Sequence, residues 1–446
     1  MVFLAHACTA LAATAALLSS TVLAGPYTNH QLVRVSTSSS DGLAALHALL
    51  EDQLGLDVWN TGADGIDVRI APEERKFLGT KGPIAKAVKV YNATVEVLEK
   101  NIQEIVDKGE SVNKAASLGF AANPTAAAAD WFSAFHTYDE IKAWYQALAT
   151  NNPTLVTFVP SIGKSRQGRD LFAVKITSNK NTATKKTFFF QGLIHAREWI
   201  SGSTVQWVSN QLVSQYASAP TLLDTTQFVI VPIVNPDGYV YTWGSNRLWR
   251  KNRASPSGVD LNRNYDDGHW GQGGSSSSTS SDTYRGPSAG SEPETQAVQN
   301  YFLAQTNLVG AIDFHSYSQL VLRPLGWTSA DSPDEAKNKV IGDGLRDKIY
   351  ASHQVRYTSQ KSIDLYVTTG TSTDFWYNRK RIYAFCIELR PGNAFGNQGF
   401  VIDPKQIVPT GEEIWAGVSW WVQYALANPL PTKAASLQAR SAARSA

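Results

Sequence analysis

The chain has 446 residues, more than the roughly 100–200 of a typical domain, so one large domain and a smaller one are expected. Its formal net charge is +2 with 17% charged residues, which provides neither a basic surface for nucleic acid nor an acidic tail. Composition and charge therefore argue against nucleic-acid binding.

The first 24 residues have the pattern of a secretory signal peptide. They form an apolar segment that ends in Val22, Leu23 and Ala24, with small residues where signal peptidase cuts. A membrane anchor is the alternative, but polar residues interrupt the segment and no basic flank follows it. Loss of the segment removes Cys8 and leaves Cys386, so no intrachain disulfide can form. We expect a secreted protein with no membrane association once the signal is removed.

Residues 25–120 are predicted to form a small α+β domain that ends in a long connecting helix. Residues 31–36 and 66–70 alternate as strands do, a helical stripe follows Asp41, and residues 89–94 fit a last strand. One face of the final helix is predicted to comprise Val95, Leu98, Ile102, Ile105 and Val106.

A stretch rich in Ala, Asn and Pro at residues 115–130 is typical of a linker or a cleavage segment. Strands and helices alternate over residues 121–429, which predicts an α/β domain whose mixed, mostly parallel twisted sheet carries helices on both faces. Capping boxes at Thr137, Ser291 and Thr410 are expected to start three of its helices. Residues 430–446 lack periodicity and are expected to be a disordered tail.

The stretch from Thr187 to Gly202 carries the first candidate site. An apolar run of strand length ends just before His195, and Glu198 lies three residues further on, so both side chains lie on one side of a tight turn. Zinc accepts such a mixed nitrogen and oxygen ligand set and keeps a position open for water at catalytic sites. A lone His-x-x-Glu string is more often a surface salt bridge or a helix pair, so further ligands decide the question.

His315 is the candidate third ligand among the 8 histidines, because it ends the apolar strand LVGAIDF as His195 ends its own. Open α/β folds bind ligands at such strand ends, although a buried core histidine is the alternative. Glu388 lies in the apolar strand YAFCIELR, where an unpaired carboxylate would be costly. It is either a general base for zinc-bound water or the partner of Arg390 or another Arg in a structural ion pair.

A basic segment, RLWRKNRASPSGVDLNRN, begins at Arg247. It is either a solvated loop or a set of fixed guanidinium groups suited to binding a carboxylate.

Over residues 130–425 the chain resembles the zinc metallocarboxypeptidases of the carboxypeptidase A/B family, in their secreted, pro-domain-bearing branch. The motifs HAREW, NPDGY, RLWRKNR, GVDLNRN, HSYSQ, Tyr366 before GTSTDFWY, and IELR occur in the family order. The residues before about 120 resemble the inhibitory pro-domain and connecting helix of that family. The resemblance implies a secreted zymogen that a protease activates and that acts on the C-termini of peptides and proteins. We expect a monomer.

For the metal site, the resemblance implies that His195, Glu198 and His315 bind one zinc ion per chain. It implies that Glu388 is the general base, which takes a proton as zinc-bound water attacks the carbonyl. Asp260 would accept a hydrogen bond from His195 and fix its tautomer.

For the substrate, the resemblance implies that Arg250 stabilises the oxyanion. Asn262 and Arg263 would bind the terminal carboxylate, Tyr366 would close over it, and Arg197 would contact the penultimate part of the substrate. Such a clamp holds the last amide of a chain at the metal.

Thr373 falls where the basic-specific members of the family carry an aspartate, so removal of apolar and aromatic C-terminal residues is expected. Asp374 matches a different family aspartate. Other wall positions fall on Leu322, Gly326, Leu365, Thr368 and Cys386. Lys361 lies near the wall and leaves room for acidic C-terminal residues.

Two other functions compete with this interpretation. An inactive relative that binds peptide C-termini is expected to lack Glu388, Arg250 or a zinc ligand, and all are present. Another zinc hydrolase, such as an endopeptidase, deacylase or amidase, would make the carboxylate clamp superfluous. Two processing sites remain hypotheses: an activation cut at Lys114 and an N-glycosylation sequon at Asn92.

Overall fold

The computed structural model describes residues 25–62, 65–122, 131–180, 185–393 and 399–431, with only the backbone course of residues 118–122. The predicted signal peptide at residues 1–24 lies outside this part of the chain. So do residues 123–130 of the expected linker and residues 432–446 of the expected tail.

The N-terminal unit, residues 25–101, is built on a four-stranded antiparallel sheet in the order β2-β3-β1-β4. Alternate apolar side chains of β1 and β3 pack against the helices, which is the α+β arrangement that their alternation predicts. Its elements are β1 Gln31–Ser36, α1 Ser40–His47, a π-helical turn Ala48–Gln53, β2 Asp57–Gly62, β3 Gly65–Ile70, a 3-10 turn Pro72–Phe77, α2 Pro83–Val90 and β4 Thr94–Glu99.

The strand predicted at residues 89–94 exists, but its bounds were wrong, since β4 begins only at Thr94. Helix α2, with Pro83 at its first position, extends to Val90 and takes up the start of the predicted range. Asn92, at φ 45°, turns the chain into β4, so Val95 and Leu98 lie in that strand instead of on a helix.

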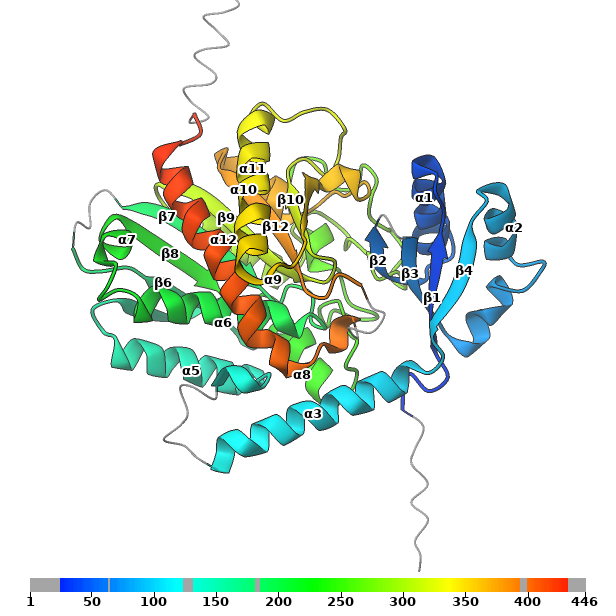
Figure 1. The fold of residues 1–446 in the computed structure, drawn as a ribbon, viewed down its shortest axis with the longest axis horizontal. Coiled ribbons are helices and arrows are strands. Elements are labelled where there is room, and N and C mark those ends of the chain that lie inside the picture. Colours follow the sequence, from blue (N-terminus) through cyan, green and yellow to red (C-terminus); the bar gives the residue numbers. More distant parts are fainter. Residues whose placement is uncertain (1–24, 63–64, 123–130, 181–184, 394–398, 432–446) are drawn as a thin grey trace, which may run out of the picture.

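Helix α3, Ile102–Ala122, leaves the N-terminal unit and runs along the rest of the molecule (Figure 1). The side-chain amide of Asn113 fixes it there, since it accepts from the Phe135 N–H at 2.7 Å and donates to the Phe135 carbonyl at 3.3 Å. Residues 115–122, predicted as linker, are therefore the last turns of this helix.

The main unit, residues 131–431, contains an eight-stranded sheet in the order β11-β10-β12-β9-β7-β8-β6-β5. Four of its seven strand pairings are parallel, which confirms the predicted mixed, mostly parallel sheet. The strands are β5 Val156–Lys164, β6 Asp170–Ile176, β7 Lys186–Gly192, β8 Thr226–Val231, β9 Leu308–Ser316, β10 Leu320–Arg323, β11 Thr358–Lys361 and β12 Tyr383–Leu389.

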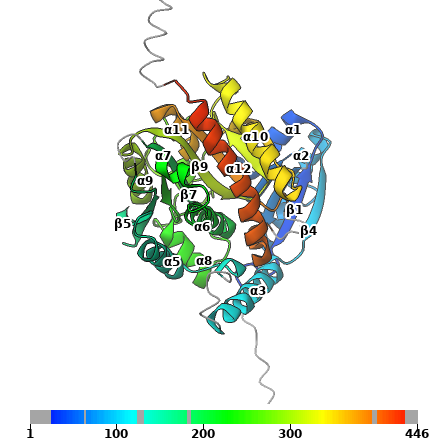
Figure 2. The same cartoon turned by 60° about the vertical axis from the view of Figure 1, so that its left-hand side comes forward.

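Helices cover both faces of this sheet, as expected (Figures 1 and 2). Phe188 and Phe190 of β7 point into a core shared with α5, α6, α10 and α12, whereas Phe189 points into a second core with α9 and α11. The helices are α5 Tyr138–Asn151, α6 Trp199–Ser214, α7 Pro220–Thr225, α8 Pro236–Gly244, α9 Pro293–Leu303, α10 Glu335–His353, α11 Ser372–Lys380 and α12 Ile407–Ala427.

The capping box at Thr137 is confirmed, but two others are wrong. Helix α9 begins at Pro293 with Glu292 before it, and α12 begins at Ile407, so Thr410 lies inside the helix. The Ser/Thr-x-x-Glu spacing of a capping box occurs at both places, but the two buried carboxylates accept hydrogen bonds from elsewhere. Glu294 accepts from the Arg166 N–H, and Glu413 accepts from the Tyr357 hydroxyl.

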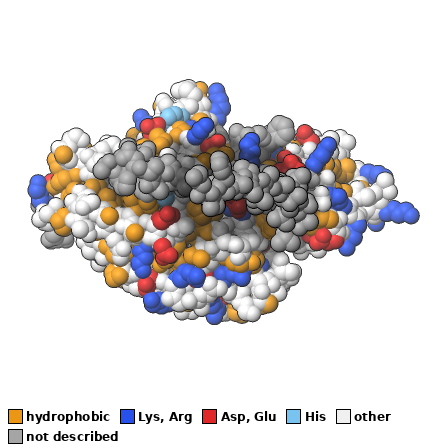
Figure 3. All heavy atoms as spheres, turned by 90° about the horizontal axis from the view of Figure 1, so that it is seen from below, with side chains coloured by type: hydrophobic (Ala, Val, Ile, Leu, Met, Phe, Trp, Pro, Cys, Tyr) orange, Lys and Arg blue, Asp and Glu red, His pale blue; other side chains and the backbone are white. Residues whose placement is uncertain are grey.

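Basic and acidic side chains are interspersed over the described atoms of the face seen from below, in keeping with the small net charge (Figure 3). Among the described residues, none of the helices has the length and apolar character that crossing a membrane requires.

Candidate active site

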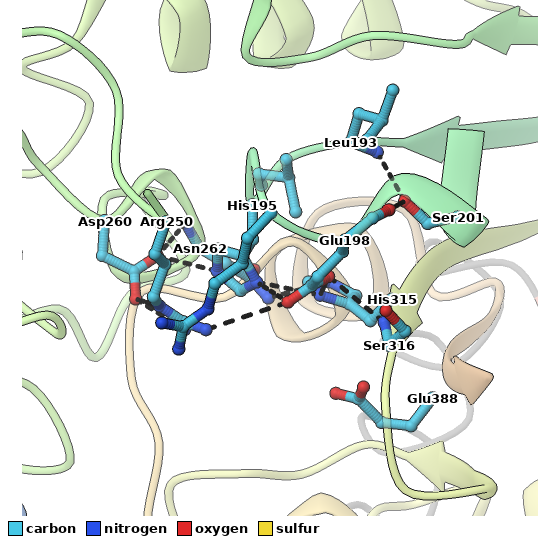
Figure 4. Close-up of polar contacts among 12 residues, drawn as sticks. Leu193, His195, Glu198, Ser201, Arg250, Asp260, Asn262, His315, Ser316 and Glu388 are labelled. Carbon is cyan, nitrogen blue, oxygen red and sulfur yellow. Dashed lines mark hydrogen bonds and ion pairs between the residues drawn. The ribbon is translucent and has the colours of Figure 1, made fainter. Parts of the chain in front are cut away.

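The parallel strands β7, β9 and β12 end side by side and bring three sequence-distant side chains together. Nδ1 of His195 lies 2.8 Å from Oε1 of Glu198 and 3.1 Å from Nδ1 of His315, which is 3.1 Å from Oε2 of Glu198 (Figure 4). Nitrogen and oxygen ligands of a tetrahedral zinc ion, at about 2.0–2.1 Å from it, lie about 3.3 Å from one another. The donor set and its spacing fit zinc.

A strained turn presents the first two ligands. Leu193, just after β7, adopts φ 51°, and its N–H donates to the Ser201 hydroxyl at 3.0 Å. The same hydroxyl donates to the carbonyl of Glu198 at 2.8 Å, which ties the turn to the start of α6. His195 and Glu198 are thus fixed within a closed loop of hydrogen bonds.

Asp260 contacts both His195 and Arg250. Its Oδ1 lies 3.0 Å from Nε2 of His195, and its Oδ2 accepts from Nη2 of Arg250 at 2.8 Å. Burial opposes ionisation, but Arg250 and then His195 hold the pKa of Asp260 well below its ordinary value. The carboxylate therefore leaves Nδ1 of His195 as the metal-facing atom.

The geometry bears on the ion-pair role considered for Glu388. Arg390 forms its ion pair with Glu413, and among the described residues Glu388 has no ion pair with an arginine. Glu388 is paired in register with His315 across β12 and β9, so both side chains lie on one face of the sheet. Burial above all raises the pKa of Glu388 to about 8, with His315 opposing and Glu198 adding to the rise. A cation at the neighbouring ligands would lower this pKa toward neutrality, a suitable range for a general base.

A cavity of about 70 Å³ adjoins the two histidines of the metal site. Arg263 enters it with Nη2 3.4 Å from the Tyr366 hydroxyl, and Asn262 is fixed because its Oδ1 accepts from the Ser372 N–H at 2.9 Å. The predicted carboxylate-binding residues therefore do lie beside the metal site. The other lining residues are His195, Arg250, His315, Leu322, Ser362, Leu365, Thr368, Thr371, Thr373, Cys386 and Glu388.

The comparisons with known proteins agree with this geometry. The zinc carboxypeptidase family model matches residues 141–417. This chain belongs to the zinc carboxypeptidase family. A carboxypeptidase B of Astacus astacus is 40% identical over 299 residues, covering 65% of this chain and 96% of that protein. A metallocarboxypeptidase A-like protein of Trichophyton verrucosum is 32% identical over 88% of this chain and 92% of its own length.

The solved structure of a carboxypeptidase A from Helicoverpa armigera superposes with a TM-score of 0.81 at 28% identity. It covers 91% of this chain and 99% of the other chain. The protein is accordingly a metallocarboxypeptidase, a hydrolase of C-terminal peptide bonds with zinc as its cofactor.

The N-terminal unit covers the site of this metallocarboxypeptidase. Nη1 of Arg197, predicted to contact substrate, donates to Oδ1 of Asp57 in β2 at 2.9 Å. The ring of His47 stacks on Tyr366 with centroids 4.4 Å apart. A second cavity, about 50 Å³, is lined from one side by Glu198, Arg250 and Glu388 and from the other by His47, Glu51 and residues 58–61.

The specificity positions have two features that the sequence did not reveal. The ammonium group of Lys361 donates to the Ser329 carbonyl at 2.8 Å and to Asp331 at 3.1 Å, so its charge is neutralised outside the cavity. Asp374 is buried and accepts from the Gly326 N–H at 2.9 Å, and burial raises its pKa to about 7. Neither charge lines the cavity.

Two carboxylates at the site were missed from the sequence. Oδ2 of Asp313 lies 3.0 Å from Nε2 of His315, and Oδ2 of Asp282 lies 4.0 Å from Nη1 of Arg197. Asp313 had a usable signal, a carboxylate in an apolar strand two residues before a candidate ligand. Asp282 had no such signal, because it lies in the Ser-rich region, where the sequence has no strand or helix pattern.

Proposed function

We propose that this chain is the secreted zymogen of a zinc carboxypeptidase that removes apolar and aromatic C-terminal residues. The observation that carries the proposal is one continuous site: a His-Glu-His centre, the carboxylate of Glu388 beside it, and a small cavity holding fixed guanidinium groups. The guanidinium groups of the cavity have a use in this site if a chain with a free C-terminal carboxylate binds there.

In the proposed mechanism, Asn262 and Arg263 bind the terminal carboxylate, and Tyr366 closes over it. His195, Glu198 and His315 would hold zinc, which supplies Lewis acidity at the scissile carbonyl and lowers the pKa of water. Glu388 takes the proton of the attacking water and passes it to the leaving nitrogen.

Arg250 stabilises the negative charge that develops on the carbonyl oxygen. Asp260 holds its guanidinium at 2.8 Å, so the positive charge is in place before the reaction and costs no reorganisation. Burial alone would lower the pKa of Arg250, but Asp260 and Glu198 raise it above its ordinary value, which keeps the group cationic.

The proposed preference rests on the side chains of the cavity. Leu322, Leu365, Thr368, Thr373 and Cys386 are apolar or neutral, and the carboxylate among the described lining residues is that of Glu388, the proposed general base. The pairing of Lys361 with Asp331 removes the main reason to expect acidic C-terminal residues. One relative bears the name carboxypeptidase B, but the residues of this cavity favour an apolar side chain.

A panel of blocked dipeptides tests the preference in the chain trimmed to begin near residue 121. Phe and Leu are expected at the C-terminus of the best substrates. Faster cleavage of C-terminal Lys or Arg would refute it. Thr373→Asp provides the matched variant, since a carboxylate at the cavity floor should raise the rate for Lys and Arg relative to Phe.

An amidated peptide separates the proposal from the other zinc hydrolases. A peptide with a free C-terminus should lose its last residue, whereas its amidated form gives Arg263 no carboxylate to bind. Equal cleavage of both forms would favour an endopeptidase or an amidase.

Latency is proposed from the position of the N-terminal unit. The Asp57 carboxylate occupies Arg197, and the His47 ring covers Tyr366, so both substrate-binding side chains are engaged. Burial raises the pKa of Glu51, but His47, and then Arg263 and Arg250, outweigh it and hold the pKa below its ordinary value. Glu51 is therefore an anion near the groups proposed to bind the substrate carboxylate. The intact chain is expected to have far lower activity than the trimmed chain, and equal activities would contradict latency.

Activation by a protease is part of the same proposal. Lys114, one possible cut, is exposed on α3, so the helix must unwind locally before a protease can bind it. Limited proteolysis followed by N-terminal sequencing would identify the bond, and cleavage that never raises activity would exclude this route.

Secretion and glycosylation are proposed together. Asn92 is exposed in the turn before β4. Expression in a eukaryotic secretory host should place the protein in the medium, with a mass that falls after glycosidase treatment and does not fall for Asn92→Gln. Size-exclusion chromatography should give the mass of one chain.

A further inference from the structure

Asp313 lies at the metal site, although the motifs that identify the family did not assign it a role. It precedes His315 by two residues in β9, so both side chains project from the same face of the sheet. Its Oδ2 lies 3.0 Å from Nε2 of His315 and also accepts from the Ser372 hydroxyl at 2.5 Å. The residue is 0% exposed.

The two histidines of the centre have the same arrangement. In each ring Nδ1 faces the other ligands, while Nε2 lies 3.0 Å from a buried carboxylate, Asp260 for His195 and Asp313 for His315. A neutral imidazole donates from one nitrogen and accepts at the other. A carboxylate can only accept, so it requires the proton on Nε2 and leaves the lone pair of Nδ1 for a metal.

The contacts of Asn262 show why His315 needs such a partner. Nδ2 of Asn262 lies 3.2 Å from Nε2 of His315, and its Oδ1 is already used by the Ser372 N–H. The amide can therefore offer His315 only a donor, which favours the tautomer with its proton on Nδ1. That tautomer cannot bind a metal through Nδ1, so Asn262 and Asp313 favour opposite proton positions.

We propose that Asp313 is a positioning residue that holds His315 in its metal-binding tautomer and thereby slows the release of zinc. The inference rests on the zinc site and is independent of the proposed latency and C-terminal preference. Failure of either of those proposals leaves it standing.

Anchoring of α11 is the competing role, because Ser372 lies in the first turn of that helix. Anchoring does not need a charge, and a buried carboxylate is costly without charged or hydrogen-bonding partners. Oδ1 of Asp313 has no hydrogen-bond partner among the described residues, which adds to that cost. A neutral side chain could anchor α11 through Ser372, whereas the contact with His315 is the one that uses the carboxylate.

The test compares Asp313→Asn with Ser372→Ala in the full chain loaded with zinc. Asp313→Asn keeps the shape of the side chain but can donate to Nε2, whereas Ser372→Ala removes the anchoring bond and leaves the carboxylate on His315. The rate of zinc transfer to an excess of chelator and the Tm of the zinc-free protein are measured for both. Asp313→Ser, smaller and neutral, is measured in parallel.

We expect zinc release from Asp313→Asn to be about 10–100-fold faster than from the wild type, the usual effect of losing such a partner. Release from Ser372→Ala should stay within about threefold of the wild type, although its Tm falls. Equal acceleration in both variants, or unchanged release from Asp313→Asn, would overturn the proposal. Failure of both Asp313 variants to fold would also overturn it, because the residue would then be required by the fold.

Discussion

Nη1 of Arg197 donates to Oδ1 of Asp57 at 2.9 Å, and this ion pair joins the main unit to the N-terminal unit at the mouth of the active site. Arg197 is 1% exposed and Asp57 is 6% exposed, so water screens the pair weakly. The same carboxylate also accepts from Arg69 of β3 at 3.0 Å. Asp57 is therefore held in place by its own unit and presented to Arg197.

Asp57→Asn should raise the residual activity of the intact chain. Removal of one partner from a buried ion pair leaves an unpaired charge, which typically costs about 3–5 kcal/mol. We expect the residual activity of the intact chain, divided by that of the trimmed chain, to rise at least about tenfold. Asp41→Asn, at an exposed position of α1, is the matched control and should leave the ratio unchanged.

Latency should also weaken with rising pH. Burial first, and then the charge of Asp57, raise the pKa of Asp282 from 3.8 to about 7. Arg197 and Lys251 face the same carboxyl group and oppose the rise. Because the raised pKa belongs to the docked state, docking favours the protonated acid. The stabilisation that Asp282 gives to the docked state is complete below pH 3.8 and is lost as the pH rises through about 7.

The measurement is the activity ratio of the intact and trimmed chains between pH 5 and pH 8, which cancels the pH dependence of catalysis itself. Each unit of pKa shift that depends on docking corresponds to about a tenfold change in the docking equilibrium. We expect the ratio to rise about tenfold or more in the wild type and to stay flat in Asp282→Asn. A flat profile in both proteins would show that this carboxyl group does not control docking.

Glu388→Gln should abolish most of the catalysis while zinc stays bound. The amide cannot accept the proton of the attacking water, and general base catalysis contributes about 10²–10⁴-fold. Trimmed protein is assayed for kcat and for bound zinc by elemental analysis. Glu412→Gln, at an exposed position of α12, is the control. Loss of zinc together with activity would mean that Glu388 belongs to the ligand set.

Arg263→Gln should lose the preference for a free C-terminus. Its guanidinium lies 3.4 Å from the Tyr366 hydroxyl in the cavity, and a glutamine offers the substrate carboxylate no charge. We expect kcat/KM for a free peptide to fall by at least about a hundredfold, while the rate for the amidated peptide changes little. Equal losses for both peptides would point to a structural role for Arg263.

The sequence predicted the centre of this site because strong local signals mark it. His195, His315 and Glu388 each interrupt or end an apolar strand, and parallel strands that end at one edge bring such residues together. Asp313 carries the same signal as Glu388, an isolated carboxylate in an apolar strand, and the cost of burying it predicts a specific partner in the same way.

The N-terminal unit was harder to predict because its signals are ambiguous over short distances. Val95 and Leu98 fit a helical spacing as well as a strand, and only the turn at Asn92 separates the two. The ion pair between Asp57 and Arg197 joins positions 140 residues apart, and neither local pattern contains information about the other. Contacts between the two units form only when the units dock, so the pattern of a single segment does not predict them.

The most direct test of the metal centre is crystallographic, with anomalous diffraction measured on both sides of the zinc absorption edge. A single zinc peak is expected about 2.0–2.2 Å from Nδ1 of His195, Nδ1 of His315 and a carboxylate oxygen of Glu198. A peak elsewhere, or a His315 ring turned away from the other two ligands, would contradict the account.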